Sequence, residues 1–166
     1  MLLTPAVIKR GEKDWKYIII HHSWSPDNKI TSDWDSIRKY HMETCHWLDI
    51  GYHFGIEYIK EIPVLQIGRS LEMSGAHTIG FNDTGIGICL IGNYDIQIPT
   101  VAQMLAIEEL CKVLMGLYDI SAKHILGHWE TYGLRGKEKQ KTCPGILFAI
   151  NSIRERLLQN DFTSEI

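Results

Sequence analysis

The chain has 166 residues, of which 45% are hydrophobic and 22% charged, and its formal net charge is −3. These are values of an ordinary globular domain that can bury a sizeable core. So small a net charge gives no general attraction to nucleic acid or anionic lipid, and no apolar stretch approaches the roughly 20 residues that a membrane-spanning helix needs. We therefore expect one domain over residues 1–166, a monomer with no nucleic-acid or membrane partner.

The first ten residues lack the basic-then-apolar order of a secretory signal peptide. We therefore expect the chain to be made in the cytoplasm and to stay there unless another factor releases it.

The first half of the chain predicts three strands and one helix. Residues 16–22 are rich in β-branched side chains and predict a buried central strand. Ser32 and Asp35 form a predicted capping box for a helix over residues 33–43. A strand pair follows at 52–58 and 64–67, joined by residues 59–63, and then a loop over 74–85 that is rich in Gly, Asn, Asp and Thr.

The second half predicts two strands and two helices. An apolar strand covers 85–91, and Thr100 with Gln103 forms a second capping box for a helix that ends near Tyr118. A short strand over 122–127 precedes a basic, flexible loop over 131–142, and a last helix covers about 145–158. This alternation favours a mixed α/β (α+β) fold with a single central mixed β-sheet flanked by helices.

The four cysteines have different surroundings in the sequence. Cys89 lies in an apolar run and Cys111 at a helical core position, so both are predicted to be small buried side chains in a reducing compartment. Cys45 is predicted to be a surface thiol. Cys143 lies in a loop context suited to a metal ligand.

A possible zinc site is distributed over the two ends of the chain. His21 and His22 end the first strand, His128 follows a short strand, and Cys143 lies 15 residues later, before a helix. A single histidine or cysteine is more often a packed or exposed residue. Two imidazoles and a thiolate together form a three-ligand zinc site with a fourth position free for water, as in catalytic sites. Adjacent strand residues point to opposite faces, so one of the histidine pair can face the metal.

Five motifs occur in order along the chain. They are His21-His22-Ser23, Leu48-Asp49-Ile50-Gly51-Tyr52-His53-Phe54, Ala76-His77-Thr78-Ile79-Gly80-Phe81-Asn82, Gly85-Ile86-Gly87-Ile88-Cys89-Leu90-Ile91-Gly92, and Gly127-His128 with Lys141-Thr142-Cys143-Pro144-Gly145. In this order they resemble the type 2 N-acetylmuramoyl-L-alanine amidase family, which shares its fold with the peptidoglycan recognition proteins. The resemblance covers about residues 15–158 and is strongest to small phage endolysins of the lysozyme-amidase kind.

The resemblance implies that His21, His128 and Cys143 bind Zn²⁺. In the family the first histidine of such a pair is the ligand, which favours His21 over His22.

The resemblance also implies roles for three further residues. Tyr52 matches the family's catalytic tyrosine, Lys141 its catalytic lysine, and His77 a histidine of the substrate groove. Many members carry a glutamate base where this chain has Cys89. The expected chemistry therefore depends on Tyr52 and Lys141.

The function that the resemblance implies is zinc-dependent hydrolysis of the amide between N-acetylmuramic acid and L-alanine in peptidoglycan, by a phage or prophage endolysin acting on the cell wall after release. Two alternatives are a cytosolic amidase that recycles anhydro-muropeptides and a non-catalytic peptidoglycan-binding module. Recycling enzymes resemble an aspartate-ligand pattern and non-catalytic members lack the cysteine ligand, so Cys143 favours the endolysin. Some phage relatives also bind a polymerase, which is a possible protein partner.

Overall fold

The computed structural model describes residues 11–25 and 33–161 and contains a five-stranded sheet with the order β3-β2-β4-β1-β5. β1, β2, β4 and β5 pair in parallel, whereas β3 is antiparallel to β2. The predicted central mixed sheet is therefore confirmed. The strands are β1 (Tyr17–His22), β2 (Phe54–Ile59), β3 (Ile62–Ile67), β4 (Gly85–Leu90) and β5 (Ile125–Gly127).

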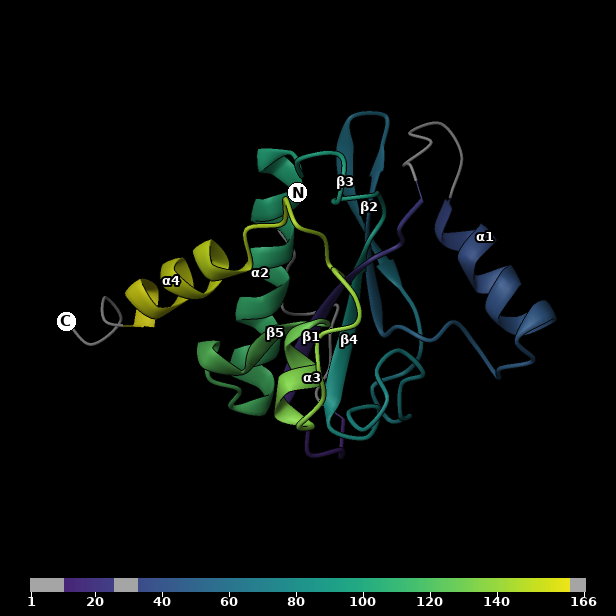
Figure 1. Cartoon of the computed structure of the whole chain (residues 1–166), viewed down its shortest axis with the longest axis horizontal. Coiled ribbons are helices and arrows are strands. Elements are labelled where there is room, and N and C mark those ends of the chain that lie inside the picture. Colours follow the sequence, from purple (N-terminus) through teal and green to yellow (C-terminus); the bar gives the residue numbers. More distant parts are fainter. Residues whose placement is uncertain (1–10, 26–32, 162–166) are drawn as a thin grey trace.

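Helices cover both faces of this sheet. Figure 1 shows α2 and α4 on one side of the strands and α1 on the other. None of the helices within the described residues is both long and apolar enough to span a membrane. The helical elements are α1 (Asp33–Lys39), η2 (Tyr40–Thr44), α2 (Val101–Tyr118), η3 (Ala122–His124), α3 (Glu130–Leu134) and α4 (Ile150–Asp161).

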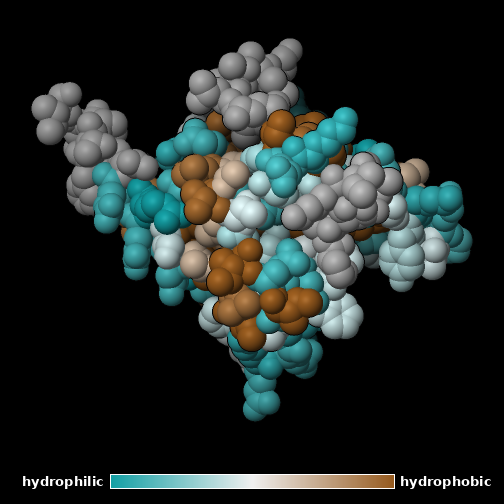
Figure 2. Space-filling view, turned by 90° about the horizontal axis from the view of Figure 1, so that it is seen from above, coloured by the Kyte–Doolittle hydropathy of each residue, from teal (hydrophilic) through white to brown (hydrophobic). Residues whose placement is uncertain are grey.

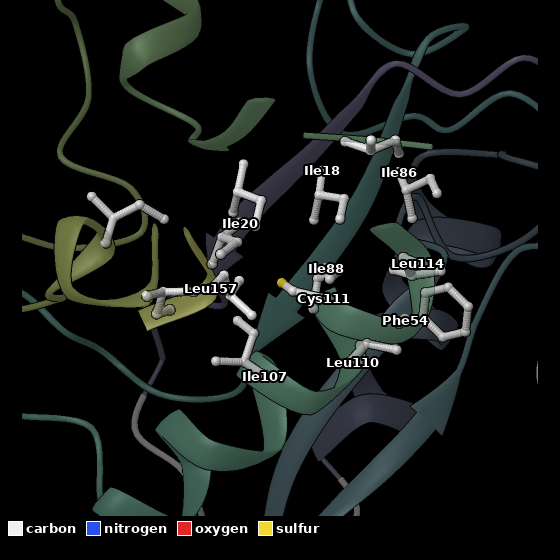
Figure 3. Packing of buried hydrophobic residues seen from close by; sticks show 14 of the residues in the cluster. Ile18, Ile20, Phe54, Ile86, Ile88, Ile107, Leu110, Cys111, Leu114 and Leu157 are labelled. Carbon is white, nitrogen blue, oxygen red and sulfur yellow. The ribbon is translucent and has the colours of Figure 1, made fainter. Parts of the chain in front are cut away.

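The side chains of β1 alternate between two packed layers. Ile18 and Ile20 belong to the main hydrophobic cluster, where they pack with residues of α2 such as Ile107 (Figure 3). Ile19 belongs to a separate cluster on the opposite face. Because successive strand residues point to opposite faces, His21 shares the face of Ile19 and lies away from the main core.

The first helix ends earlier than predicted, and its first amide groups are bound by a residue distant in sequence. α1 ends at Lys39 and is followed by the π-helical turn η2, so the prediction of one regular helix over 33–43 was wrong. The predicted cap Ser32 lies outside the described residues. The buried Glu57 of β2 accepts hydrogen bonds from the backbone amides of Asp33 and Trp34. A carboxylate at this position satisfies free amide groups and complements the positive end of the helix.

The β2–β3 connection is tighter than predicted. Ile59 pairs directly with Ile62, so the turn consists of Lys60 and Glu61, with φ values of 49° and 63°. Such two-residue turns require positive φ at both positions and usually contain Asn or Gly. Neither residue gave that signal. Tyr52, predicted to lie in the strand, precedes β2.

Three boundaries differ in the second half. The predicted strand over 122–127 is the helical turn η3 followed by the short β5, and α3 occupies part of the predicted loop over 131–142. The last helix starts at Ile150 instead of near 145. The segment before it is hydrogen-bonded to the connection between β4 and α2. The Leu147 amide donates to the Tyr94 carbonyl at 2.9 Å, and the Ile146 amide donates to Asp95 Oδ1 at 3.0 Å. The Thr100–Gln103 capping box and the extent of α2 are as predicted.

Apolar side chains on the surface seen from above form separate patches with hydrophilic side chains between them (Figure 2). Exposed apolar residues near the start of α2 include Ile98, Val101 and Leu105. On this face the apolar area is divided, which differs from the contiguous patch typical of a docking surface.

The buried His53 joins β4 to the loop after β3. Its Nδ1 accepts a hydrogen bond from the Gly87 amide at 3.0 Å, and its Nε2 donates to the Met73 carbonyl at 3.1 Å. Burial lowers the pKa of His53 from 6.5 to about 4. The folded protein therefore holds this imidazole in its neutral form.

We predict that His53 makes the folded state sensitive to acid. Below pH 6.5 the unfolded chain protonates His53 while the folded protein resists until about pH 4, so the free energy of unfolding falls as the pH falls through this window. Between pH 7 and pH 5 this group should contribute a loss of about 2 kcal/mol. Urea unfolding of the wild type and of His53→Gln at both pH values measures it. An equal loss in the two proteins would contradict the prediction.

Candidate metal centre and active site

Parallel pairing brings the two candidate histidine ligands to one edge of the sheet. β5 lies beside β1 and parallel to it, and the His128 amide continues the pairing by donating to the Ile20 carbonyl at 3.1 Å. The His21 and His128 ring centroids are 4.6 Å apart. Open α/β sheets place their sites at the carboxyl ends of parallel strands, and this pair follows that rule.

Cys143 reaches the histidines from the loop before α4. Its Sγ lies 3.6 Å from His21 Nδ1, and its carbonyl accepts a hydrogen bond from the Trp129 amide at 2.9 Å. Cys143 is 9% exposed. Cys143 therefore borders both His21 and the residue that follows His128.

Asp95, in the connection between β4 and α2, holds the cysteine loop on both sides of Cys143. Its Oδ2 accepts a hydrogen bond from Thr142 Oγ1 at 2.8 Å, and its Oδ1 accepts one from the Ile146 amide at 3.0 Å. No local pattern in the sequence indicates this role, because the carboxylate binds residues about fifty positions away.

The donor atoms of His21, His128 and Cys143 all lie within 4.8 Å of one another. Two imidazole nitrogens and one sulfur are the donor set that zinc prefers, and the cluster borders a cavity that leaves room for a further ligand. These residues therefore fit a zinc ion. His22 is oriented differently: its Nδ1 accepts a hydrogen bond from the Tyr94 amide at 3.2 Å.

Burial sets the protonation of the three candidate ligands in the metal-free protein. Desolvation lowers the pKa of His21 well below 6.5 and that of His128 to about 4. Both imidazoles are thus neutral, as metal ligands must be. Burial also raises the pKa of the Cys143 thiol to about 12, so this group must lose its proton when a metal binds.

Tyr52 packs against the candidate metal centre. Its ring centroid is 5.1 Å from that of His21, and its hydroxyl is hydrogen-bonded to the thiol of Cys89. Cys89 is the register partner of His21 across β4 and β1, and it is buried as predicted. Burial raises the pKa of Tyr52 well above 10, so the phenol keeps its proton and can act as a hydrogen-bond donor.

Lys141 is an exposed residue that lines the cavity beside the cluster. Its positive charge is among the causes that lower the pKa values of His128 and His21, after desolvation. The ammonium group is therefore close enough to act on charge that develops at the cluster.

His77 lies behind His21 as well as along the cavity. His77 Nδ1 is 3.1 Å from His21 Nε2, the ring nitrogen that faces away from Cys143. Desolvation lowers the pKa of His77 to about 3, so this ring is also neutral. The prediction placed His77 in a substrate groove, and the structure adds a direct contact with a candidate ligand.

A cavity of about 820 Å³ is lined by the three candidate ligands together with Tyr52, His77 and Lys141. Trp24 and Trp47 also line it, and they are 70% and 37% exposed. Exposed indole faces at a cavity can stack on ligand rings.

His41 is a cavity residue that the sequence did not indicate. Its Nδ1 accepts a hydrogen bond from the Gly51 amide at 3.2 Å, and its ring lies 4.6 Å from that of Trp47. His41 thereby connects η2 to the segment that leads into Tyr52. Its helical spacing from Trp34 was visible in the sequence, but its position at the cavity was not.

Comparison with known proteins gives a family match over most of the chain. A family model described as N-acetylmuramoyl-L-alanine amidase matches residues 11–146. An N-acetylmuramoyl-L-alanine amidase of Sus scrofa is 34% identical over 141 residues, which cover 78% of this chain and 21% of the relative. The chain spans about a fifth of the length of the mammalian amidases that it matches.

Two solved structures resemble the fold. The endolysin N-acetylmuramoyl-L-alanine amidase LysCS from Clostridium intestinale has a TM-score of 0.71 and 28% identity, covering 88% of this chain and 85% of its own. A variant of Drosophila PGRP-LB, solved in complex with tracheal cytotoxin, has a TM-score of 0.64 and 28% identity, covering 84% and 80%.

Proposed function

Because the chain belongs to the N-acetylmuramoyl-L-alanine amidase family, we propose that it hydrolyses the amide between N-acetylmuramic acid and L-alanine in peptidoglycan, with a zinc ion held by His21, His128 and Cys143. The observation that carries the proposal is the convergence of these three donor groups within 4.8 Å at the side of a large cavity. Peptidoglycan or a muropeptide is the corresponding ligand.

The side chains around the cluster supply the remaining requirements of amide hydrolysis. When bound, zinc would polarise the scissile carbonyl and activate the attacking water. Water adds to the carbonyl carbon, the carbon–nitrogen bond breaks, and the departing amine of L-alanine takes up a proton. The Lys141 ammonium would stabilise negative charge on the carbonyl oxygen, and the Tyr52 phenol would donate a hydrogen bond to that oxygen or to the water.

The biological setting that we propose is a phage or prophage endolysin, made in the cytoplasm and acting on the wall after release. The similarity to the LysCS endolysin supports this setting. The cysteine in the candidate ligand set supports it over a recycling amidase or a binding module. A recycling amidase would prefer soluble anhydro-muropeptides to cell walls. A binding module would bind peptidoglycan without turnover.

We predict that the purified protein binds about one zinc per chain and that Cys143→Ser weakens this binding strongly, because a hydroxyl is a much poorer zinc donor than a thiolate. Metal content after dialysis against a weak chelator measures the effect. Cys45→Ser is the matched control, since this partly buried cysteine lies outside the cluster. Equal zinc in the Cys143→Ser and Cys45→Ser proteins would contradict the proposed ligand set.

The products released from purified cell walls identify the bond that is cut. We expect new free amines from L-alanine, no new reducing sugar ends, and loss of both turnover and zinc after treatment with a strong chelator. New reducing ends without new amines would indicate a glycosidase instead. Tight binding of cell walls without either product would identify a binding module.

We predict that Lys141→Met and Tyr52→Phe keep the zinc but each lower kcat by about 100-fold, the size of effect seen when one group that stabilises an oxyanion is removed. Lys137→Met is the control, because Lys137 is an exposed lysine of the same loop. A variant that retains the full kcat would remove that residue from the proposed chemistry.

A further inference from the structure

The imidazole of His77 occupies a slot whose walls are the backbone at Gly75 and Gly87. A Cβ atom at Gly75 would lie 2.4 Å from His77 Cδ2, and one at Gly87 would lie 2.5 Å from the same atom. Contacts this short do not occur, so any side chain at either position would displace the ring. The two glycines therefore leave the space that the imidazole occupies.

The backbone on either side of the ring is also fixed. Asn82 Oδ1 accepts hydrogen bonds from the amides of His77 and Thr78, at 2.9 Å and 2.8 Å. One side-chain oxygen thus holds the turn that presents His77 to the slot. The backbone of His77 is thus held by hydrogen bonds, and its ring fills a space lined by glycine backbone.

The hydrogen bonds of the ring define which nitrogen carries the proton. His77 Nε2 lies 3.0 Å from the Gly85 carbonyl oxygen, which can only accept, so Nε2 is the donor. In a neutral imidazole the other nitrogen is then an acceptor. His77 Nδ1 is 3.0 Å from Thr78 Oγ1 and 3.1 Å from His21 Nε2.

The same reasoning extends to His21. Since His77 Nδ1 accepts, His21 Nε2 must carry its proton, and Thr78 Oγ1 lies 3.2 Å from that nitrogen as a second partner. His21 Nδ1 is left with a lone pair, and it is the nitrogen that faces Cys143 Sγ. The hydrogen bonds run in one direction, from His21 through His77 to a backbone carbonyl.

We propose that His77 is a positioning residue that fixes the tautomer and ring orientation of His21, so that His21 Nδ1 is available as a metal donor before any ion binds. This role rests on the proposed zinc site and adds to it. Partners that orient a metal-bound histidine typically change metal affinity about 10- to 100-fold when they are removed.

Two substitutions of similar size separate the hydrogen bond from the space that the ring fills. His77→Asn keeps an oxygen that can accept from His21 Nε2, whereas His77→Leu has no acceptor. We expect His77→Leu to weaken zinc binding about 10- to 100-fold in a competition titration, and His77→Asn to recover most of the loss. A packing role alone would give the two variants equal affinities, which would overturn the proposal.

Nitrogen-15 NMR of the metal-free protein gives a readout that does not depend on zinc or activity. Long-range proton–nitrogen correlations should show both His21 and His77 protonated at Nε2 in the wild type, and His21 with a mixed tautomer in His77→Leu. A wild-type His77 protonated at Nδ1 would overturn the proposal even if a variant failed to fold. A wild type that shows these tautomers but binds no zinc would instead refute the proposed function.

Discussion

The position of β1 between two parallel partners is the constraint on which the site depends. β4 pairs along one side of β1 and β5 along the other, so the carboxyl ends of these strands meet at one edge. The alternation along β1 sends Ile20 into the main core and His21 to the opposite face. A shift of one residue would exchange His21 with His22 and would also move every isoleucine of the strand. The hydrophobic core thus fixes which histidine faces Cys143.

The protonation of the site follows from its burial. A cluster of neutral imidazoles and a protonated thiol can be buried at much lower cost than charged groups, and a metal cation would then replace the thiol proton. Cys89 continues this pattern, because a neutral thiol occupies the strand position beside His21 and is the hydrogen-bond partner of the Tyr52 phenol. The positive charge beside the cluster lies on its exposed side, where Lys141 lines the cavity. In the proposed chemistry, charge is therefore concentrated where the substrate arrives.

The sequence predicted the elements whose signals are local. β1 follows from its β-branched run, and α2 from its capping box and apolar spacing. The start of α1 depends on Glu57 of β2, and α3 is secured by a carboxylate, Glu130, that binds Arg154 at 2.9 Å. Such contacts between distant residues leave no local pattern. The same holds for the site: the convergence of the three candidate ligands was predicted, whereas the contacts of His41 and Asp95 with it depend on the folded arrangement.

The glycines of β4 connect the fold to the proposed metal donor. Small and large residues alternate along the strand. The large side chains of Ile86, Ile88 and Leu90 belong to the main core, and the site face carries Gly85, Gly87 and Cys89. A Cβ at Gly85 would lie 2.7 Å from Ile19 Cδ1, and one at Gly87 would enter the ring of His77. Small residues on this face therefore leave the space that Ile19, His77 and Tyr52 occupy. The pattern reads as an ordinary apolar strand in the sequence. In the folded protein it leaves room for the imidazole beside His21, so the proposed orientation of the donor depends on residues that have no side chain.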